Sequence, residues 1–372
     1  MNKNKKMLFL LGGLCLVAII LFVLFIKFNM NDSTEKKETE TTVNVKIDEE
    51  KIEEHHEMID DPFMGTDGTV KKTATISGLT FKTPHEITDY PVQEGTMPII
   101  LGVSNKYMVV KSFGDILHIY NFETKKKIKI ADHVDHAIIS DDNQFVFYST
   151  KEALFQYDIG RNVNNGVIVM GPPASTMESF AYHNGLLVYT FIDTGIEGDP
   201  YRTESFVLPR FMGTYTTQQV TNNIDNTTPT LTLFNNEFHY FDKATNSVEK
   251  IALGAGHQTA FAFPTKVISP SKIEANANGD WLVLDYDEST YTVKVQVSNG
   301  TVSGFESITD ASWYDADHLL VLSDTNLYLY NVKTGKKVGI EYEVSHYKNV
   351  QNGNIVYVPN KEIISVIEKR AD

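Results

Sequence analysis

Downstream of residue 61 the hydrophobic residues come in short runs and not in the spacing of a helix. From Pro62 onward, runs of Val, Ile, Leu, Tyr and Phe are broken every few residues by Asn, Asp, Gly, Ser and Thr. No long pattern with the period of an amphipathic helix appears. Short β-branched and aromatic runs between turn-forming residues predict strands. The pattern therefore predicts an all-β domain.

One strand–turn–strand unit repeats along this part of the chain. In Asn326–Val338 an apolar and aromatic run leads into Asn331, and Gly335 can take the positive φ that a tight hairpin needs. Three earlier segments align with it, each with an aromatic residue just before the anchoring Asn or Asp: Leu117–Asn121, Leu154–Asp158 and Phe238–Asp242. The anchoring positions are separated by one, two and two periods of about 40 residues.

A second series of strands supports the same period. Short apolar runs follow turn-forming residues and begin at Tyr107, Phe145, Leu186, Trp281, Leu319 and Ile355. The one double-length gap holds a further run, Thr230–Phe234, which brings the number of units to seven. A period of about 40 residues with several short strands is typical of the four-stranded blade of a β-propeller. Because a ring of blades must be closed, we expect the N-terminal segment Val70–Phe81 to supply the outer strand of the last blade.

Two motifs resemble those of known propellers. The turn Ser140–Val146 resembles the one that opens the second strand in WD-repeat and YVTN-type propellers, and Tyr330–Lys336 resembles the hairpin between their third and fourth strands. The sequence has no Trp-Asp dipeptide at the strand ends and no Tyr-Val-Thr-Asn string. The resemblance covers residues 66–372 and implies a seven-bladed β-propeller, but a fold does not define a function.

The chain begins with a different kind of segment. Met7–Phe28 carries a single charge, at its far end, and at ~1.5 Å per residue a helix of this length spans roughly 30 Å, the hydrocarbon core of a bilayer. Three lysines precede it and acidic residues follow it, so the positive-inside rule predicts residues 1–6 in the cytoplasm and the rest of the chain outside. The alternative is a cleaved signal peptide, whose apolar region is shorter and ends in small residues, which Phe25–Phe28 lacks. We expect an uncleaved single-pass transmembrane helix, with Cys15 packed or facing lipid.

The segment after the apolar run is acidic. Residues 29–65 are polar and poor in aromatic residues, which predicts a flexible stalk between the membrane and the propeller. Glu53–Glu57 contains two histidines that could bind a divalent metal, but a charged linker explains the same residues and we predict no metal site. The whole chain has a formal net charge of −15 and a pI of about 5.2. An acidic protein gains nothing electrostatically from a phosphate backbone, so we expect no nucleic-acid partner.

The sequence contains no strong catalytic motif. It has no nucleophile elbow, phosphate loop, Cys/His pair or metal-binding His-Glu-x-x-His helix. His118 and His239 stand at a repeat position that sister copies fill with Phe or Tyr, which favours a packing role. The Asp-x-Asp pairs Asp285–Asp287 and Asp315–Asp317 each place two carboxylates on one strand face, an arrangement that could suit Ca²⁺, but Asp is also common in turns for backbone reasons. We therefore predict no catalytic residue and no cofactor.

Two segments interrupt the period and are the best candidates for binding, because insertions in a propeller project from the end of a blade. Phe191–Phe211 has an acidic loop followed by two of the four arginines in the chain, and Gly254–Lys272 is rich in aromatic residues. The alternative is that both are lengthened loops without a partner. The predicted binding residues are Asp193, Glu197, Asp199, Arg202, Arg210, His257, Phe261 and Phe263.

Together these features predict a membrane-anchored, extracytoplasmic β-propeller that binds or scaffolds proteins in a bacterial cell envelope. The alternative is an extracellular propeller enzyme, a hydrolase or lyase with Asp, Glu and His side chains in the central channel. The lining of the channel separates the two. Three or more converging carboxylates or imidazoles favour the enzyme, whereas an apolar or Tyr/Asn-rich lining favours binding.

Overall fold

The computed structural model of the chain divides into two compact units, residues 1–56 and 57–372. It describes part of the second unit: residues 61–90, 96–170, 175–183, 185–193, 203–211, 214–215, 218–222, 230–235, 237–251, 257–290, 292–350, 353–359 and 363–370. Within these ranges the regular structure is entirely β, which confirms the all-β prediction. No helix in this part of the chain is long and apolar enough to cross a membrane. The predicted anchor at Met7–Phe28 and most of the predicted stalk lie outside the described residues.

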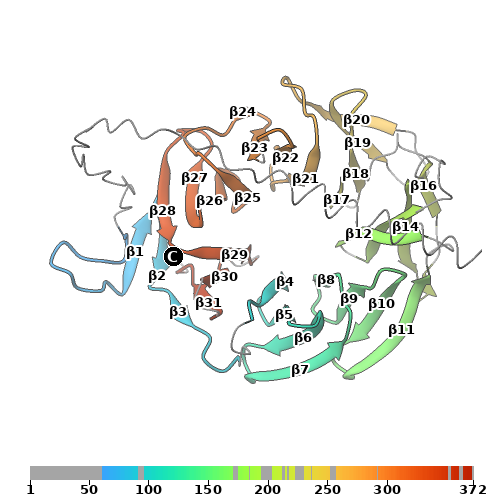
Figure 1. Cartoon of the computed structure of the whole chain (residues 1–372), viewed down its shortest axis with the longest axis horizontal. Coiled ribbons are helices and arrows are strands. Elements are labelled where there is room, and N and C mark those ends of the chain that lie inside the picture. The colour runs from blue at the N-terminus through green and yellow to red at the C-terminus, as the bar shows by residue number, and fades with distance from the viewer. Residues whose placement is uncertain are drawn as a thin grey trace, which may run out of the picture. The chain divides into compact units, whose positions relative to one another are not determined.

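Antiparallel sheets follow one another around a ring, and most have four strands in sequence order (Figure 1). The first two sheets consist of β4 (Ile99–Val103), β5 (Tyr107–Ser112), β6 (Ile116–Asn121) and β7 (Lys126–Ala131), then β8 (His136–Ile139), β9 (Phe145–Ser149), β10 (Ala153–Asp158) and β11 (Val163–Met170). The third sheet has five strands: β12 (Ser175–His183), β13 (Leu186–Asp193), β14 (Thr203–Phe211), β15 (Thr214–Tyr215) and β16 (Gln218–Asn222). This sheet departs from the regular repeat because β15 and β16 both pair with β14.

The later sheets return to four strands. The fourth sheet consists of β17 (Leu231–Phe234), β18 (Glu237–Asp242), β19 (Ser247–Ile251) and β20 (His257–Ala262). The fifth sheet consists of β21 (Pro270–Ala275), β22 (Trp281–Asp287), β23 (Thr292–Val297) and β24 (Gly300–Thr301). The sixth sheet consists of β25 (Ile308–Trp313), β26 (His318–Ser323), β27 (Asn326–Asn331) and β28 (Lys337–Glu341). The last sheet consists of β29 (Val344–Asn349), β30 (Ile355–Pro359), β31 (Ser365–Ile367) and β3 (His85–Glu86). Among the described residues six sheets therefore have the regular four-stranded form of a blade, one fewer than the seven predicted, because the third sheet departs from it.

The apolar core lies between consecutive sheets. Each apolar cluster joins one sheet to the next, and one of them, which contains Ile100, Tyr120 and Val356, joins the last sheet to the first. The second strand of a sheet is covered on both faces, so β9 and β26 are buried along their whole length. Strands buried on both faces read as continuous apolar runs. This explains why the second strands were the most regular signal in the sequence.

The repeat hairpin has the predicted turn chemistry. In the sixth sheet the side-chain oxygen of Asn331 accepts hydrogen bonds from the amides of Lys333 and Thr334 at 3.0 and 2.9 Å, and Gly335 has a φ of 70°. In the fourth sheet, however, the alignment is wrong by one strand. The segment Phe238–Asp242 lies in β18, a second strand, and Thr230–Phe234 overlaps β17, a first strand. Hairpins between any two neighbouring strands need the same turn residues, so turn chemistry alone does not number the strands.

The ring is closed by the N-terminal part of the unit, but mainly by residues after the predicted segment, of which Thr80 and Phe81 alone pair with the residues that follow β31. Val70–Phe81 contributes to a separate hairpin of β1 (Thr73–Ile76) and β2 (Leu79–Lys82), which turns at Ser77 and Gly78 with φ of 49° and 85°. The strand that completes the last sheet is β3, which pairs with β31. The Ser-Gly dipeptide is a turn signal that makes one long strand impossible there.

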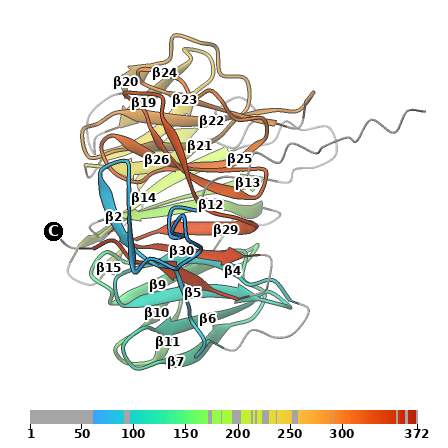
Figure 2. The ribbon, with the colours of Figure 1, turned by 90° about the vertical axis from the view of Figure 1, so that its left-hand side faces the viewer.

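The β1–β2 hairpin stands beside the last two sheets (Figures 1 and 2). Phe81 is fully buried in the apolar cluster that those two sheets share. The amide of Lys82 donates to the carbonyl of Glu368 at 2.8 Å, and the amide of Arg370 donates to the carbonyl of Thr80 at 2.9 Å. The start and the end of the unit are therefore held together by backbone hydrogen bonds as well as by packing.

Candidate functional site

The first strands of the sheets lie nearest the axis of the ring (Figure 1). A cavity of about 220 Å³ is lined there by residues of β4, β8, β12 and β29. Its polar lining comes from His136, His346 and Lys348, and its apolar lining comes from Ile99, Ile100, Leu101, Ala137, Ile138 and Phe180. The central channel is therefore a candidate site, because ligands prefer concave, mainly apolar pockets with a few polar groups.

A network of charges lies beside this cavity. Lys272 and Glu274 are two residues apart in β21, so their side chains point to the same face of the strand. The ammonium of Lys272 lies 3.4 Å from a carboxylate oxygen of Glu274, 3.4 Å from one of Asp310 in β25, and donates to the carbonyl of Ala311 at 2.8 Å. Glu274 also accepts the amide of Trp313 at 3.1 Å. One lysine thus joins the inner strands of the fifth and sixth sheets.

His346 and Lys348 bring the last sheet into the channel. The Nε2 atom of His346 lies 2.6 Å from the carbonyl oxygen of Ile100 in β4. A carbonyl only accepts, so Nε2 carries the hydrogen and the lone pair of the neutral ring is on Nδ1. The ammonium of Lys348 has neither an ion pair nor a hydrogen bond with any described residue.

Burial and neighbouring charges shift the pKa values of these groups. Burial lowers the pKa of Lys272, but the carboxylates of Glu274 and Asp310 outweigh that effect and the net pKa is raised. Burial raises the pKa of Glu274, against the opposing effect of Lys272. Burial also lowers the pKa of Lys348, and the nearby Lys272 charge lowers it further. Burial lowers the pKa of His346, which keeps the ring neutral at pH 7.

The channel has as many carboxylates and imidazoles as expected of a propeller enzyme, but most of them are bound to other residues of the protein. Two carboxylates, Glu274 and Asp310, and two imidazoles, His136 and His346, approach the channel. Glu274 and Asp310 are both bound to Lys272, and His346 is bound to a backbone carbonyl. A general acid or base needs a proton that it can exchange with a substrate. Hydrogen bonds and ion pairs occupy these three groups, so the arrangement suits the binding of a polar partner better than proton transfer.

The predicted binding residues fall into two groups. Glu197, Asp199 and Arg202 lie outside the described residues. The backbone places the other polar ones in strands of the third and fourth sheets: Asp193 ends β13, Arg210 lies in β14 and His257 begins β20. The structure therefore describes no side-chain arrangement that unites these polar residues.

The aromatic members of the predicted set pack in the core. Phe263 is 5% exposed and belongs to the apolar cluster between the fourth and fifth sheets, with Phe261 packed against it. Their rings meet edge to face with centroids 4.9 Å apart. Packing accounts for both side chains: Phe261 lies in β20 and Phe263 directly follows it, and both contact the apolar cluster between the fourth and fifth sheets.

The predicted packing roles of two histidines agree with their surroundings. His239 is 2% exposed, and its ring lies 4.8 Å from that of Trp281 and 6.1 Å from that of Phe234. Burial lowers the pKa of His118 to about 4, helped by Lys127 and Lys129.

The Asp-x-Asp carboxylates serve the backbone. Asp285 accepts the amides of Ile268 and Ser269 at 2.9 and 2.7 Å, and Asp315 accepts the amides of Asp317 and His318 at 2.8 Å each. No group of three metal-ligating side chains occurs in the part of the chain that the structure describes.

Sequence reasoning missed the channel residues Lys272, Glu274, Asp310, His346 and Lys348. A signal was present: Lys272 and Glu274 alternate with buried Ile273, as polar and apolar residues do in a strand with one exposed face. These polar residues lie within the regular first strands of the repeat and not in its interruptions, so the spacing of the repeat does not single them out.

Comparison with known proteins identifies the architecture but no family. No protein-family description matches the sequence. No curated protein matches it either. Solved structures do match: streptogramin B lyase (TM-score 0.51, 11% identity, covering 77% of this chain and 98% of that one) and the AfRom2 CNH domain (TM-score 0.52, 10% identity, 78% and 99%). The fold is a β-propeller.

A third propeller of the same kind is a catalytically inactive variant of virginiamycin B lyase from Staphylococcus aureus with quinupristin. It has a TM-score of 0.52 and 13% identity, and the match covers 77% of this chain and 99% of that one. Identities this low show a shared propeller and nothing about what the chain binds.

Proposed function

We propose that this chain is a membrane-anchored propeller that binds or scaffolds proteins outside the cytoplasmic membrane, through the channel that Lys272, His346 and Lys348 border. In this proposal Met7–Phe28 is the anchor and the residues that follow form a stalk. The propeller has seven blades if the five-stranded third sheet is counted as one of them. The apolar clusters on both sides of that sheet, toward β9 and toward β18, support this count.

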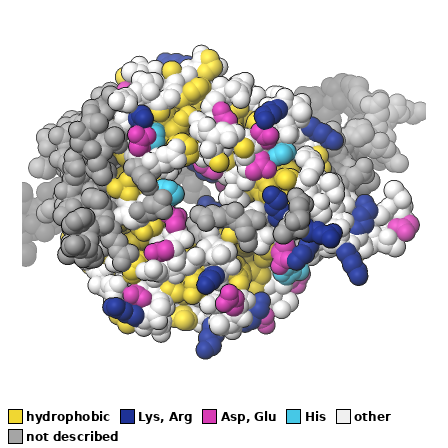
Figure 3. Space-filling model, turned by 180° about the vertical axis from the view of Figure 1, so that it is seen from behind, with side chains coloured by type: hydrophobic (Ala, Val, Ile, Leu, Met, Phe, Trp, Pro, Cys, Tyr) yellow, Lys and Arg dark blue, Asp and Glu magenta, His cyan; other side chains and the backbone are white. Residues whose placement is uncertain are grey.

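The observation that carries the proposal is the pairing of the channel charges. Glu274 and Asp310 are bound to Lys272, and His346 is bound to Ile100, so both carboxylates and one of the two imidazoles are already used. Lys348 remains as a cation for a partner's carboxylate. On the face drawn in Figure 3, basic and acidic side chains are interspersed, which suits a protein partner better than the uniformly charged backbone of a nucleic acid.

One observation favours the enzyme as a second candidate. The pKa of Lys348 is lowered by burial and by Lys272, and a lysine with a lowered pKa can act as a base or nucleophile. A hydrolase or lyase would use Lys348 with the Nδ1 lone pair of His346. This function requires turnover of a substrate, which separates it from binding.

The experiment that tests the proposal is crosslinking in intact cells with the full chain and two charge-reversal variants. Lys348→Glu changes the channel, and Lys243→Glu changes an exposed lysine in the β18–β19 turn as the matched control. We expect one crosslinked partner that is lost in Lys348→Glu and retained in Lys243→Glu. Equal crosslinking in all three proteins would exclude the channel as the binding site. Turnover of a glycan or ester that Lys348→Gln abolishes would favour the enzyme.

The membrane topology is tested separately. Protease added to intact protoplasts should digest the propeller. Full protection of the propeller would contradict an extracytoplasmic location and would leave the channel proposal untouched.

A further inference from the structure

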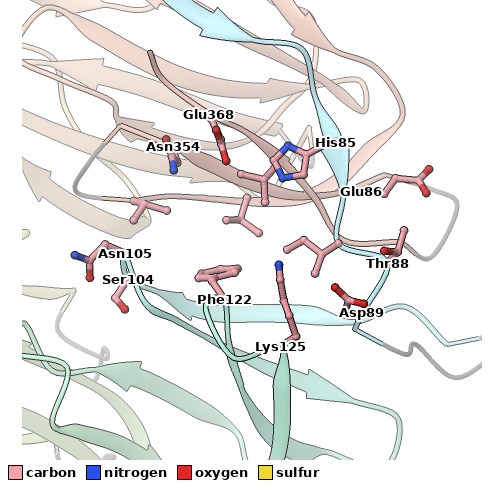
Figure 4. Close-up of a pocket in the computed structure, with 14 residues that line it drawn as sticks. His85, Glu86, Thr88, Asp89, Ser104, Asn105, Phe122, Lys125, Asn354 and Glu368 are labelled. Atoms are coloured by element: carbon pink, nitrogen blue, oxygen red, sulfur yellow. The ribbon is translucent and has the colours of Figure 1, made fainter. Parts of the chain in front are cut away.

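A second cavity, of about 250 Å³, lies at the seam where the last sheet meets the first (Figure 4). Its walls come from three parts of the chain that are distant in sequence: the segment that contains β3, the turns of the first sheet, and strands β30 and β31 of the last sheet. It is distinct from the channel, because the two cavities share no lining residue. A molecule bound here would touch both sides of the ring closure.

The cavity has an apolar floor. Ile87, Val350, Val356 and Val366 are each at most 7% exposed and belong to the apolar cluster that joins the last sheet to the first, and Phe122 packs against that cluster. These side chains line the cavity as well as the core. An apolar group of a ligand would therefore find a surface that is already formed, and its burial would be favourable by about 25 cal/mol per Å².

Lys125 is unusual because of its backbone. It lies in the β6–β7 turn with a φ of 57°, and its amide donates to the carbonyl of Asn121 at 2.9 Å. In the sixth sheet Gly335 fills the same place, with a φ of 70° and a 2.9 Å bond to the carbonyl of Asn331. The second and fourth sheets have Asn162 and Asn246 four residues after the anchoring Asp, with φ of 55° and 56°.

The first sheet therefore has a lysine at a turn position where three other sheets have glycine or asparagine, which tolerate the left-handed backbone region. Glycine and asparagine adopt positive φ more readily than other residues, and a lysine there adds strain. The side chain of Lys125 is exposed, so packing in the core does not offset the backbone strain. Figure 4 shows it pointing from the turn into the cavity. Its ammonium forms neither an ion pair nor a hydrogen bond with the residues that the structure describes.

A carboxylate without a cation lies on the same rim. Asp89 lines the same cavity as Lys125, and no described lysine, arginine or histidine forms an ion pair with it (Figure 4). Glu368, on the opposite wall, is already bound to Lys82 at 2.5 Å. His85 and Glu86 also line the cavity, and in Figure 4 the carboxylate of Glu86 points away from Lys125. The rim thus offers the ammonium of Lys125 and the carboxylate of Asp89 over an apolar floor.

We propose that the seam cavity binds a small zwitterion with an apolar side chain, such as a free apolar amino acid or a dipeptide. The ligand's carboxylate is held by the ammonium of Lys125, its ammonium by the carboxylate of Asp89, and its side chain by the floor of Ile87 and Val356. The volume of about 250 Å³ suits one or two amino-acid residues. The bound ligand ties the last sheet to the first, so binding stabilises the closed ring.

The test uses the purified full-length protein in detergent and isothermal titration with leucine, leucyl-leucine, N-acetyl-leucine and leucinamide. We expect leucine or leucyl-leucine to bind and to raise the unfolding midpoint, and each blocked form to bind at least tenfold more weakly. Equal affinity for the blocked forms, or no binding of any of the four, would refute the proposal.

The variant Lys125→Asn removes the ammonium and restores the residue that two sister turns carry. We expect it to lose at least tenfold in affinity for the same ligand while its ligand-free unfolding midpoint stays equal or rises. A lysine with a purely structural role would show the opposite: a lower midpoint and unchanged binding. Lys126→Asn, an exposed neighbour with an ordinary φ, is the matched control and should bind as the natural sequence does.

Discussion

Replacing Lys272 with methionine should destabilise the propeller, and the loss should shrink in acid. The methionine keeps the aliphatic stem but leaves the carboxylates of Glu274 and Asp310 together without their shared cation. At an effective dielectric constant of about 20, an ion pair at 3.4 Å has a Coulomb energy of about 5 kcal/mol, most of which the loss of hydration offsets. Removing one partner of a buried pair costs about 3–5 kcal/mol.

The expected loss for this variant is smaller, about 2–3 kcal/mol, because water still reaches these side chains. The side chains are 32% exposed for Lys272, 27% for Glu274 and 30% for Asp310. The pKa of Glu274 is already raised by burial, and losing Lys272 raises it further. A carboxyl group with a raised folded pKa takes up a proton in the folded state first, so the folded state is favoured as pH falls. The deficit of the variant should therefore decrease between pH 7 and pH 5.

Urea unfolding of both proteins at pH 7 and pH 5 measures this difference. The triple variant Lys272→Met, Glu274→Gln, Asp310→Asn is the control, since it removes the charges as a set and should recover most of the lost stability. A single variant as stable as the natural sequence at pH 7 would refute the reasoning, and so would a deficit that does not change with pH.

Three further outcomes are expected. Burial lowers the pKa of His118 to about 4, whereas the unfolded histidine takes up a proton near pH 6.5, so the folded state loses stability as pH falls below about 6.5. His118→Phe should remove about 1–2 kcal/mol of that loss, measured by urea unfolding at pH 7 and pH 5. Asp285→Ala leaves the amides of Ile268 and Ser269 without their acceptor and should cost about 2–3 kcal/mol in the same assay, whereas Asp287→Ala, in an exposed turn, should cost less than about 1 kcal/mol. Phe81→Ala should cost about 3–5 kcal/mol, because the ring is fully buried between the last two sheets; a loss below about 1 kcal/mol would contradict that role of the β1–β2 hairpin.

The sequence predicted the fold from strands that are buried on both faces. Runs such as Phe145–Ser149 and His318–Ser323 have no exposed side, so their apolar character is continuous and their spacing is visible. The strands that lie farther out were harder to number. In the turn after Asp242, as in the turn after Asn331, the side-chain oxygen accepts the amide two residues further on, although the two turns join different strands of their sheets. Local turn chemistry identifies a hairpin, but only the strand pairing across the whole sheet shows which two strands the hairpin joins.

The candidate site was less accessible to sequence reasoning than the fold. Lys272 and Asp310 lie on different sheets and meet only because the ring places their strands side by side. Each is an ordinary polar residue in a strand that is half exposed. The strain at Lys125, by contrast, follows from an alignment of turns that the sequence already offers, since Gly335 fills the same position in the sixth sheet. Its significance depends on the cavity beneath it, which no repeat pattern reveals.

The pairing of β3 with β31 also has a consequence for the order of folding. His85 lies opposite Val366, so the closure joins two segments separated by most of the length of the unit. This pairing cannot form until the final strand has left the ribosome. Contacts between such distant segments form slowly because the loop between them must first be ordered. Until then the first sheet lacks its neighbour on one side, and the apolar residues that later form the seam are exposed to water and to other chains. The newly made protein therefore depends on the strands of its last sheet to cover apolar surface that its first sheet has already formed.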